Sequence, residues 1–103
     1  MTAANGHRGE AALRVAGEML VLRPSFGALV AAEGELGPLF ALVERAADGR
    51  LTLGETVGLF WHCLRERPPG LTREMLGDAV AEAGLSAAMP ALRLLLQQIL
   101  AGR

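Results

Sequence analysis

MLVLRPSFGALV, residues 19–30, is the stretch in which the hydrophobic pattern of this 103-residue chain changes. Apolar residues before Pro24 alternate in the manner of a β-strand, whereas those after it recur at the spacing of an α-helix. Ser25 supplies the hydroxyl that a helix N-cap needs, and Phe26 is the first apolar residue of the helical pattern. The stretch therefore predicts that a strand ends near Leu22 and that a helix begins at residue 26.

A second apolar run with strand-like alternation precedes this stretch. Leu13 and Val15 flank Arg14, and Ala16-Gly17-Glu18 follows them with a glycine suited to a tight turn. The two runs predict a β-hairpin.

Helical patterns fill the remainder of the chain. They predict a first helix over about 26–36 and a second over about 38–47. A third begins near residue 53 and is stopped by Pro68-Pro69-Gly70. Thr72 caps a fourth helix and Ser86 caps a fifth, which reaches about residue 101. Thr52 and Glu55 have the spacing of a capping box at the start of the third helix. Several apolar residues are expected to face the core: Leu53, Val57, Phe60 and Leu64 in the third helix, and Met75, Leu76, Ala79, Val80 and Ala83 in the fourth.

The predicted fold class is α+β but predominantly α, with an N-terminal β-hairpin followed by four or five short helices in one compact domain. The chain is 51% hydrophobic, and a chain of this size buries roughly two thirds of its unfolded surface. The first six residues are mostly small and polar, so we expect a flexible segment over 1–9 and a single domain over 10–103.

Charge and composition exclude several functional classes. Ten basic and eleven acidic residues give a net charge of −1, and the arginines are scattered, so no nucleic-acid partner is expected. No apolar run approaches the ~20 residues of a membrane span, and no signal sequence is visible. The single cysteine, Cys63, fits a reducing compartment. These features predict a cytoplasmic protein without a membrane partner.

Residues for catalysis are also missing from the sequence. It contains no glycine-rich phosphate loop, paired-histidine metal motif or nucleophile elbow. His7 and His62 lie far apart in the chain, and His62 is expected to be solvated. Cys63 flanks an apolar stripe and is interpreted as a buried small hydrophobe. We therefore expect no enzyme, no catalytic residue, no cofactor and no bound metal.

Residues 48–55, DGRLTLGE, resemble the second half of an EF-hand calcium loop. The match fails further upstream, because Ala46 would occupy a ligand position and residues 39–46 have a helical pattern. Helix capping by Thr52 and Glu55 explains the same residues. A calcium-responsive adaptor remains only as a minor alternative.

Two features point to a protein partner. The last helix carries a wide apolar arc that is either buried core or a surface for self-association or client binding. Glu33 lies on the apolar stripe of the first helix, where its carboxylate must reach solvent or find a partner such as Arg45. The candidate partner-binding residues are Leu92, Leu95, Leu96, Ile99, Leu100 and Glu33.

Residues 5–10, NGHRGE, the junction LRPSFGAL at 22–29, and Glu33 four positions before Gly37 together resemble the small gene-transfer-agent proteins related to phage tail assembly chaperones. Ser25 stands where that pattern has threonine, which keeps the capping hydroxyl. The resemblance implies a chaperone domain that binds the tape-measure protein and other tail proteins, and the apolar arc of the last helix adds a homo-oligomer as a further possibility. The alternative is a structural tail or connector component, and the resemblance does not distinguish a prophage from a gene transfer agent. It supplies no catalytic residues.

Overall fold

The computed structural model describes residues 11–15 and 17–102. The segment 1–9 and the stretch 5–10 used above therefore lie outside the described residues. A hairpin of β1 (Ala11–Val15) and β2 (Glu18–Leu22) comes first. The helices are α1 (Phe26–Leu36), α2 (Leu39–Ala47), α3 (Leu53–Cys63), α4 (Arg73–Ala83) and α5 (Leu85–Ala101). This confirms the predicted hairpin and the helical remainder.

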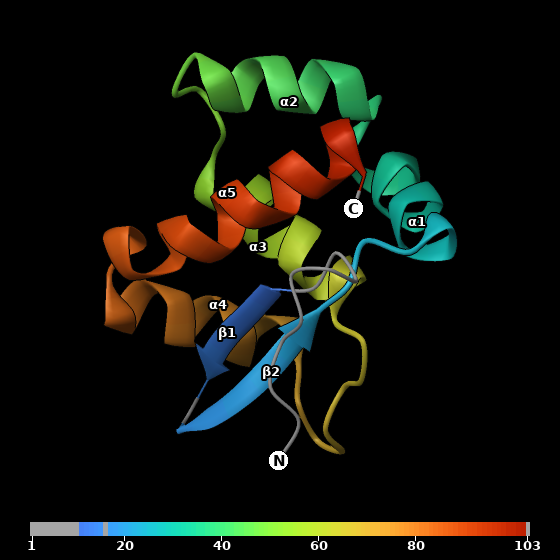
Figure 1. The fold of residues 1–103 in the computed structure, drawn as a ribbon. Helices are drawn as coiled ribbons and strands as arrows, with labels where there is room; N and C mark the ends of the chain where they lie inside the picture. Colours follow the sequence, from blue (N-terminus) through green and yellow to red (C-terminus); the bar gives the residue numbers. More distant parts are fainter. Residues whose placement is uncertain (1–10, 16, 103) are drawn as a thin grey trace.

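The hairpin has the expected antiparallel register. Leu13 pairs with Leu20 and Ala11 pairs with Leu22 across the two strands. All four side chains are buried, because α4 and α5 cover the hairpin through their contacts with β1. In Figure 1 the hairpin lies below α5, with α3 behind it at the centre of the fold.

The end of α3 differs from the prediction. The helix was expected to continue to Pro68, but it stops at Cys63 because the next residues pair with β2. The Arg23 amide donates to the Cys63 carbonyl at 2.7 Å, and the Arg65 amide donates to the Val21 carbonyl at 2.9 Å. The outer edge of β2 is thereby covered by the chain that follows α3.

Helix caps agree with the sequence at three of four positions. Ser25, Thr52 and Thr72 each accept a backbone hydrogen bond at the start of α1, α3 and α4. Ser86 was expected to cap the last helix, but α5 begins one residue earlier, at Leu85. Its N-cap is Gly84, whose φ of 92° is readily adopted only by glycine, so the chain reverses there without a side-chain cap.

The core surrounds α3. Phe60 and Leu59 of this helix are fully buried together with Leu22, Leu42 and Leu76. Helices α1 and α4 both pack on α3, and α5 packs on α4 and β1. Three residues predicted to face inward lie at the surface instead, namely Leu53, Met75 and Ala83.

Among the described residues, no single helix meets the length and hydropathy of a membrane span, and only the bent pairs α1–α2 and α4–α5 do so by length and composition.

Candidate functional site

An open apolar groove lies where α2, α3 and α5 meet. Its volume is about 470 Å³. The walls come from apolar side chains of α2, α5 and the start of α3, including Val43, Leu51, Leu53, Met89, Leu92 and Leu96. Nearly all of the side chains that face this hollow are apolar, so it is the first candidate for a partner-binding site.

Helix α5 sets the length of the groove. The α5 residues that line the groove recur every three or four positions from Leu85 to Leu100, which places them on one face of the helix. At 1.5 Å per residue this face is about 22 Å long. Leu85 and Leu100 at its two ends are 57% and 60% exposed. Leucines this exposed contribute little hydrophobic free energy to folding, so the two ends of the groove remain available to a partner.

The groove carries one charged side chain, Arg93 of α5, among its lining residues. Arg45 and Glu55 form an ion pair that ties α2 to α3 nearby. The backbone amide of Thr52 and the Arg45 guanidinium both hydrogen bond to Glu55 and lower the pKa of its carboxyl. This carboxylate is therefore engaged in holding the two helices together.

The structure separates the predicted residues of the last helix into two groups. Leu92, Leu96 and Leu100 line the groove. Leu95 is only 1% exposed and belongs to the core, and Ile99 packs against that core without lining the groove. The wide apolar arc of α5 is therefore partly core and partly groove.

Sequence reasoning missed the rest of the groove. Val43 and Ala46 on α2 and Leu51 before α3 were not among the candidate partner-binding residues, yet all three line the hollow. The exposed position of Leu53 could not be read from its spacing, which matches that of the buried Val57. Only the placement of α2 and the start of α3 beside α5 reveals the site.

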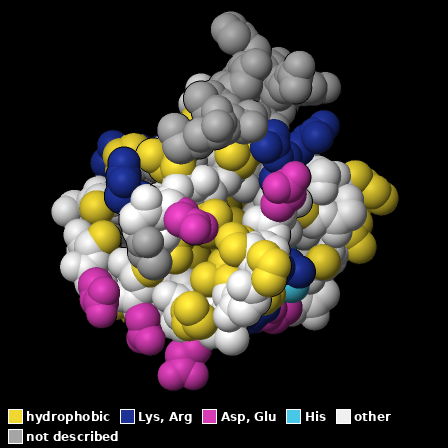
Figure 2. Space-filling model, turned by 90° about the horizontal axis from the view of Figure 1, so that it is seen from below, with side chains coloured by type: hydrophobic (Ala, Val, Ile, Leu, Met, Phe, Trp, Pro, Cys, Tyr) yellow, Lys and Arg dark blue, Asp and Glu magenta, His cyan; other side chains and the backbone are white. Residues whose placement is uncertain are grey.

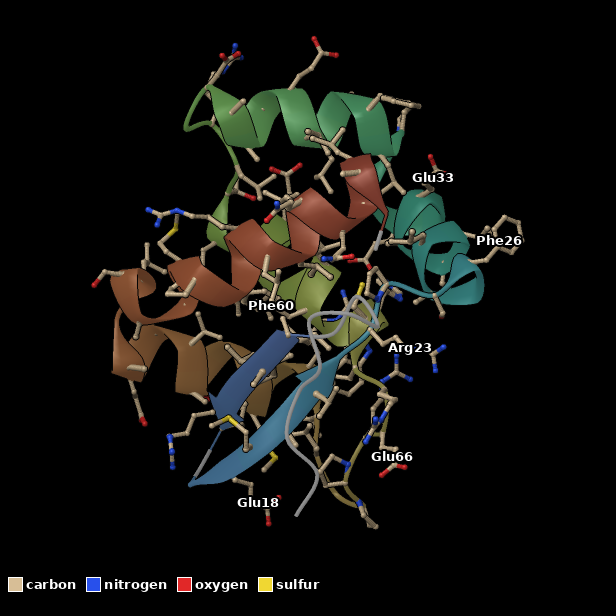
Figure 3. All side chains as sticks on the ribbon, viewed as in Figure 1. Glu18, Arg23, Phe26, Glu33, Phe60 and Glu66 are labelled. Carbon is tan, nitrogen blue, oxygen red and sulfur yellow. The ribbon has the colours of Figure 1, made fainter. Side chains whose placement is uncertain are left out.

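Glu33 lies at the exposed surface of α1 (Figure 3). Its Oε2 accepts a hydrogen bond from the Leu39 amide at 3.1 Å. Glu33 therefore satisfies a free backbone donor at the start of α2, whose N-cap Pro38 has no side-chain hydrogen bond to offer. The suggested partner Arg45 binds Glu55 instead, so that pairing was wrong.

Helices α1 and α2 each carry a largely exposed aromatic side chain. Phe26 and Phe40 are 85% and 81% exposed, and Val30 on α1 is half exposed. Figure 3 shows Phe26 pointing away from the body of the molecule. In α1 only Ala32 is buried, although most of its residues are apolar. This helix therefore presents a second apolar surface.

A polar cluster joins three helices on another side of the fold. Glu35 of α1 contacts the Nε2 of His62 at 2.7 Å and the Nη2 of Arg73 at 2.8 Å. Hydrogen bonds from Arg73 and then His62 lower the pKa of the Glu35 carboxyl to about 2. The expectation of a solvated His62 was wrong, because the histidine bridges α1 and α4 from α3. The geometry is that of a structural tie between helices.

The remaining sequence candidates have structural roles. Cys63 is fully buried, and burial raises the pKa of its thiol to about 12, as expected for a core residue. Thr52 and Glu55 form the predicted capping box, and α2 occupies the place of the first half of a calcium loop. Within residues 11–15 and 17–102, no group of three or more His, Cys, Asp or Glu residues could hold a metal ion.

A family model described as "Phage tail tube protein, GTA-gp10" matches residues 8–102 of the chain. The match includes the hairpin, every helix from α1 to α5 and therefore the whole groove. No curated protein and no solved structure gives a significant match.

Proposed function

The chain belongs to the phage tail tube protein family GTA-gp10, and we propose that its role within tail production is that of an assembly chaperone for the tape-measure protein. Family membership makes it a protein of phage-type or gene-transfer-agent tails. The chaperone role is more specific than family membership, and the proposal for it rests on the apolar groove.

The groove has the form that an amphipathic helix requires. A face about 22 Å long accommodates roughly four helical turns, since one turn rises 5.4 Å. Helix-in-groove recognition uses apolar anchors of the bound helix at i, i+3, i+4 and i+7, which is the spacing found on α5 itself. Binding such a segment removes its apolar face from water, and by mass action this reduces the fraction free to aggregate.

Exposed aromatic side chains extend the apolar area available to a client. Phe40 lies on α2, the helix that also provides one wall of the groove. Aromatic residues contribute a large share of the energy at protein interfaces. A chaperone of this kind acts on newly made tail proteins, so we place its work in the cytoplasm.

A structural role in the tail is the second candidate. It is favoured by the description of the family, which names a tail tube protein. In that case, the groove would receive another tail subunit and the chain would remain in the particle.

The experiment is an affinity pull-down of the tagged full chain from its native host during particle production, with partners identified by mass spectrometry. Leu100→Glu places a charge on an exposed wall of the groove, where the cost to folding is small. Gln97→Glu is the matched control, since Gln97 is exposed on the same helix but does not line the groove.

The proposal predicts recovery of the tape-measure protein with the wild type and with Gln97→Glu, and its loss with Leu100→Glu. Equal recovery with all three chains would remove the groove as the binding site. Recovery of tube or connector subunits in place of the tape measure, with the chain present in purified particles, would replace the chaperone role by the structural one.

A further inference from the structure

Two side chains with a hydroxyl or a charge, Thr56 of α3 and Arg93 of α5, interrupt the apolar lining of the groove. The Thr56 hydroxyl donates to the Thr52 carbonyl at 3.0 Å, so its hydrogen is already used within α3. Arg93 is exposed, and its guanidinium has no hydrogen bond, ion pair or ring contact within residues 11–15 and 17–102. Of these two groups, Arg93 is therefore the one that is left to bind a partner.

Arg93 lies halfway along the groove and at its border. It follows Leu85 by eight positions and precedes Leu100 by seven, and these two leucines mark the ends of the lining face of α5. At 3.6 residues per turn the lining residues of α5 fall within an arc of about 140°, with Arg93 at one limit of the arc and Ala88 at the other. A helix bound in the groove would therefore meet the Arg93 position beside its apolar stripe, near the middle of the bound segment.

The groove itself offers Arg93 no carboxylate. The lining contains no Asp or Glu, and the residues one turn away on the same helix, Met89 and Gln97, are uncharged. Glu55 at the start of α3 is bound by Arg45. Figure 2 shows the molecule from the side away from α2, and there acidic and basic side chains lie on the same face. The lining of the groove, in contrast, carries charge of one sign.

A guanidinium at this position discriminates among helices that enter the groove. A bound helix displaces water from the Arg93 guanidinium, and removing a charge from water is unfavourable unless a new partner replaces the water. A carboxylate is the best such partner, because its two oxygens match the fork of N–H donors on the guanidinium. A helix that brings an apolar or a basic residue to the same place leaves the charge unpaired or repels it.

We propose that Arg93 determines the specificity of the groove, and that the groove binds an amphipathic helix whose apolar stripe is bordered at mid-length by a carboxylate. This specificity rests on the proposed function, because it requires that the groove takes a helix, but it does not depend on which tail protein supplies that helix. Charge complementarity selects the acidic helix over wholly apolar and basic helices that could fill the same hollow.

Two synthetic peptides of identical composition test the position of the charge. Each has roughly 18 residues, about 27 Å as a helix, with leucines at i, i+3, i+4 and i+7 spacing. One peptide has a glutamate at mid-length on each border of the leucine stripe and two glutamines at one end; the other has these residues exchanged. Their net charges are equal, and glutamates on both borders make the result independent of the direction in which the peptide lies. Fluorescence anisotropy with the purified full chain gives the Kd of each.

The wild type is expected to bind the mid-glutamate peptide about tenfold more tightly than its isomer. Arg93→Gln should remove this preference, and Arg93→Glu should prefer a third peptide with lysines at the two mid-length positions. Arg14→Gln is the matched control, since Arg14 is exposed on β1 and does not line the groove, and it should keep the wild-type preference. Gln97→Glu places a carboxylate one turn from Arg93, but exposed pairs of this kind are weak, so the preference should fall only slightly. Circular dichroism confirms that every variant is folded.

Equal binding of the two isomers by the wild type, or a preference that survives Arg93→Gln, would overturn the role of Arg93. If the isomers bind alike and Leu100→Glu abolishes both, the groove takes helices without selecting charge, and the proposed function stands without this specificity. Failure of both peptides to bind would overturn helix binding in the groove and the specificity together. A preference for the mid-glutamate peptide, combined with recovery of tube subunits in the pull-down, would uphold the specificity and replace the chaperone role by the structural one.

Discussion

Thr52 begins α3 by a reciprocal pair of hydrogen bonds. Its hydroxyl accepts from the Glu55 amide at 3.1 Å, and its own amide donates to the Glu55 carboxylate at 3.0 Å. We predict that Thr52→Ala lowers the free energy of unfolding by about 1 kcal/mol, measured by urea denaturation. Ser86→Ala is the control, because Ser86 makes no capping bond and its loss should change little. Equal effects of the two substitutions would contradict the role assigned to Thr52.

Glu35 links the stability of the fold to pH. Its carboxyl has a pKa of about 2 in the folded protein, below the ordinary 4.5, because the charged form is bonded to Arg73 and His62. A depressed pKa stabilises the fold above pH 4.5, and this contribution disappears as the pH falls toward 2. The Glu35 side chain is 39% exposed, so solvent screens part of its attraction to Arg73 and His62.

We therefore predict that Glu35→Gln destabilises the protein near neutral pH and that its difference from the wild type shrinks on acidification from about pH 5 to about pH 2. Denaturation curves of both proteins across this range provide the measurement. A difference that stays constant with pH would mean that the ionised carboxylate does not hold the cluster.

Residues that act through local rules were predictable from the sequence, and those with distant partners were not. Thr52 caps a helix through a residue three positions away, and Cys63 follows from the apolar stripe beside it. His62 depends on Glu35, which is 27 residues away, so no local pattern could identify the pair. The same limitation led to the wrong pairing of Glu33 with Arg45.

At the scale of the element, two glycines of α1 have opposite roles. Gly34 lies in the helix interior with open space where a Cβ would be, whereas Gly37 ends the helix with a φ of 89°. We predict that Gly34→Ala raises the free energy of unfolding by up to about 1 kcal/mol, because alanine restricts the unfolded chain and favours the helix.

Gly37→Ala should instead lower the free energy of unfolding by about 1 kcal/mol, since an alanine in that conformation is strained. Thermal denaturation of the two variants is the check. A stabilising Gly37→Ala would show that the helix ends differently from the structure described here.

Element boundaries were predicted well where a proline, a glycine or a cap fixes them. The first helix, 26–36, matches because Ser25 and Gly37 delimit it. The third helix ended earlier than predicted because Leu64 pairs with Leu22, and this contact spans 42 positions of the chain. Such pairing competes with the helix at its C-terminal end, and periodicity contains no information about it.

At the scale of the whole molecule, the groove emerges only from the arrangement of helices. The wide apolar arc of α5 correctly indicated that this helix has more apolar surface than one packed face requires. It did not indicate which part is core, as Leu95 and Leu96 show, since the former is buried and the latter lines the groove. The rest of the site is supplied by α2, by α3 and by the loop between them, and their contribution depends on where they lie relative to α5.

We propose that this tail protein keeps the tape-measure protein soluble during assembly and does not remain in the tail. The most direct measurement is to express the tape-measure protein with and without the chain and to determine its soluble fraction, while purified particles are assayed for the chain. We expect a soluble tape measure only in the presence of the chain, and particles that lack the chain. A tape measure whose solubility is independent of the chain, together with particles that contain the chain as a regular component, would rule out the chaperone role.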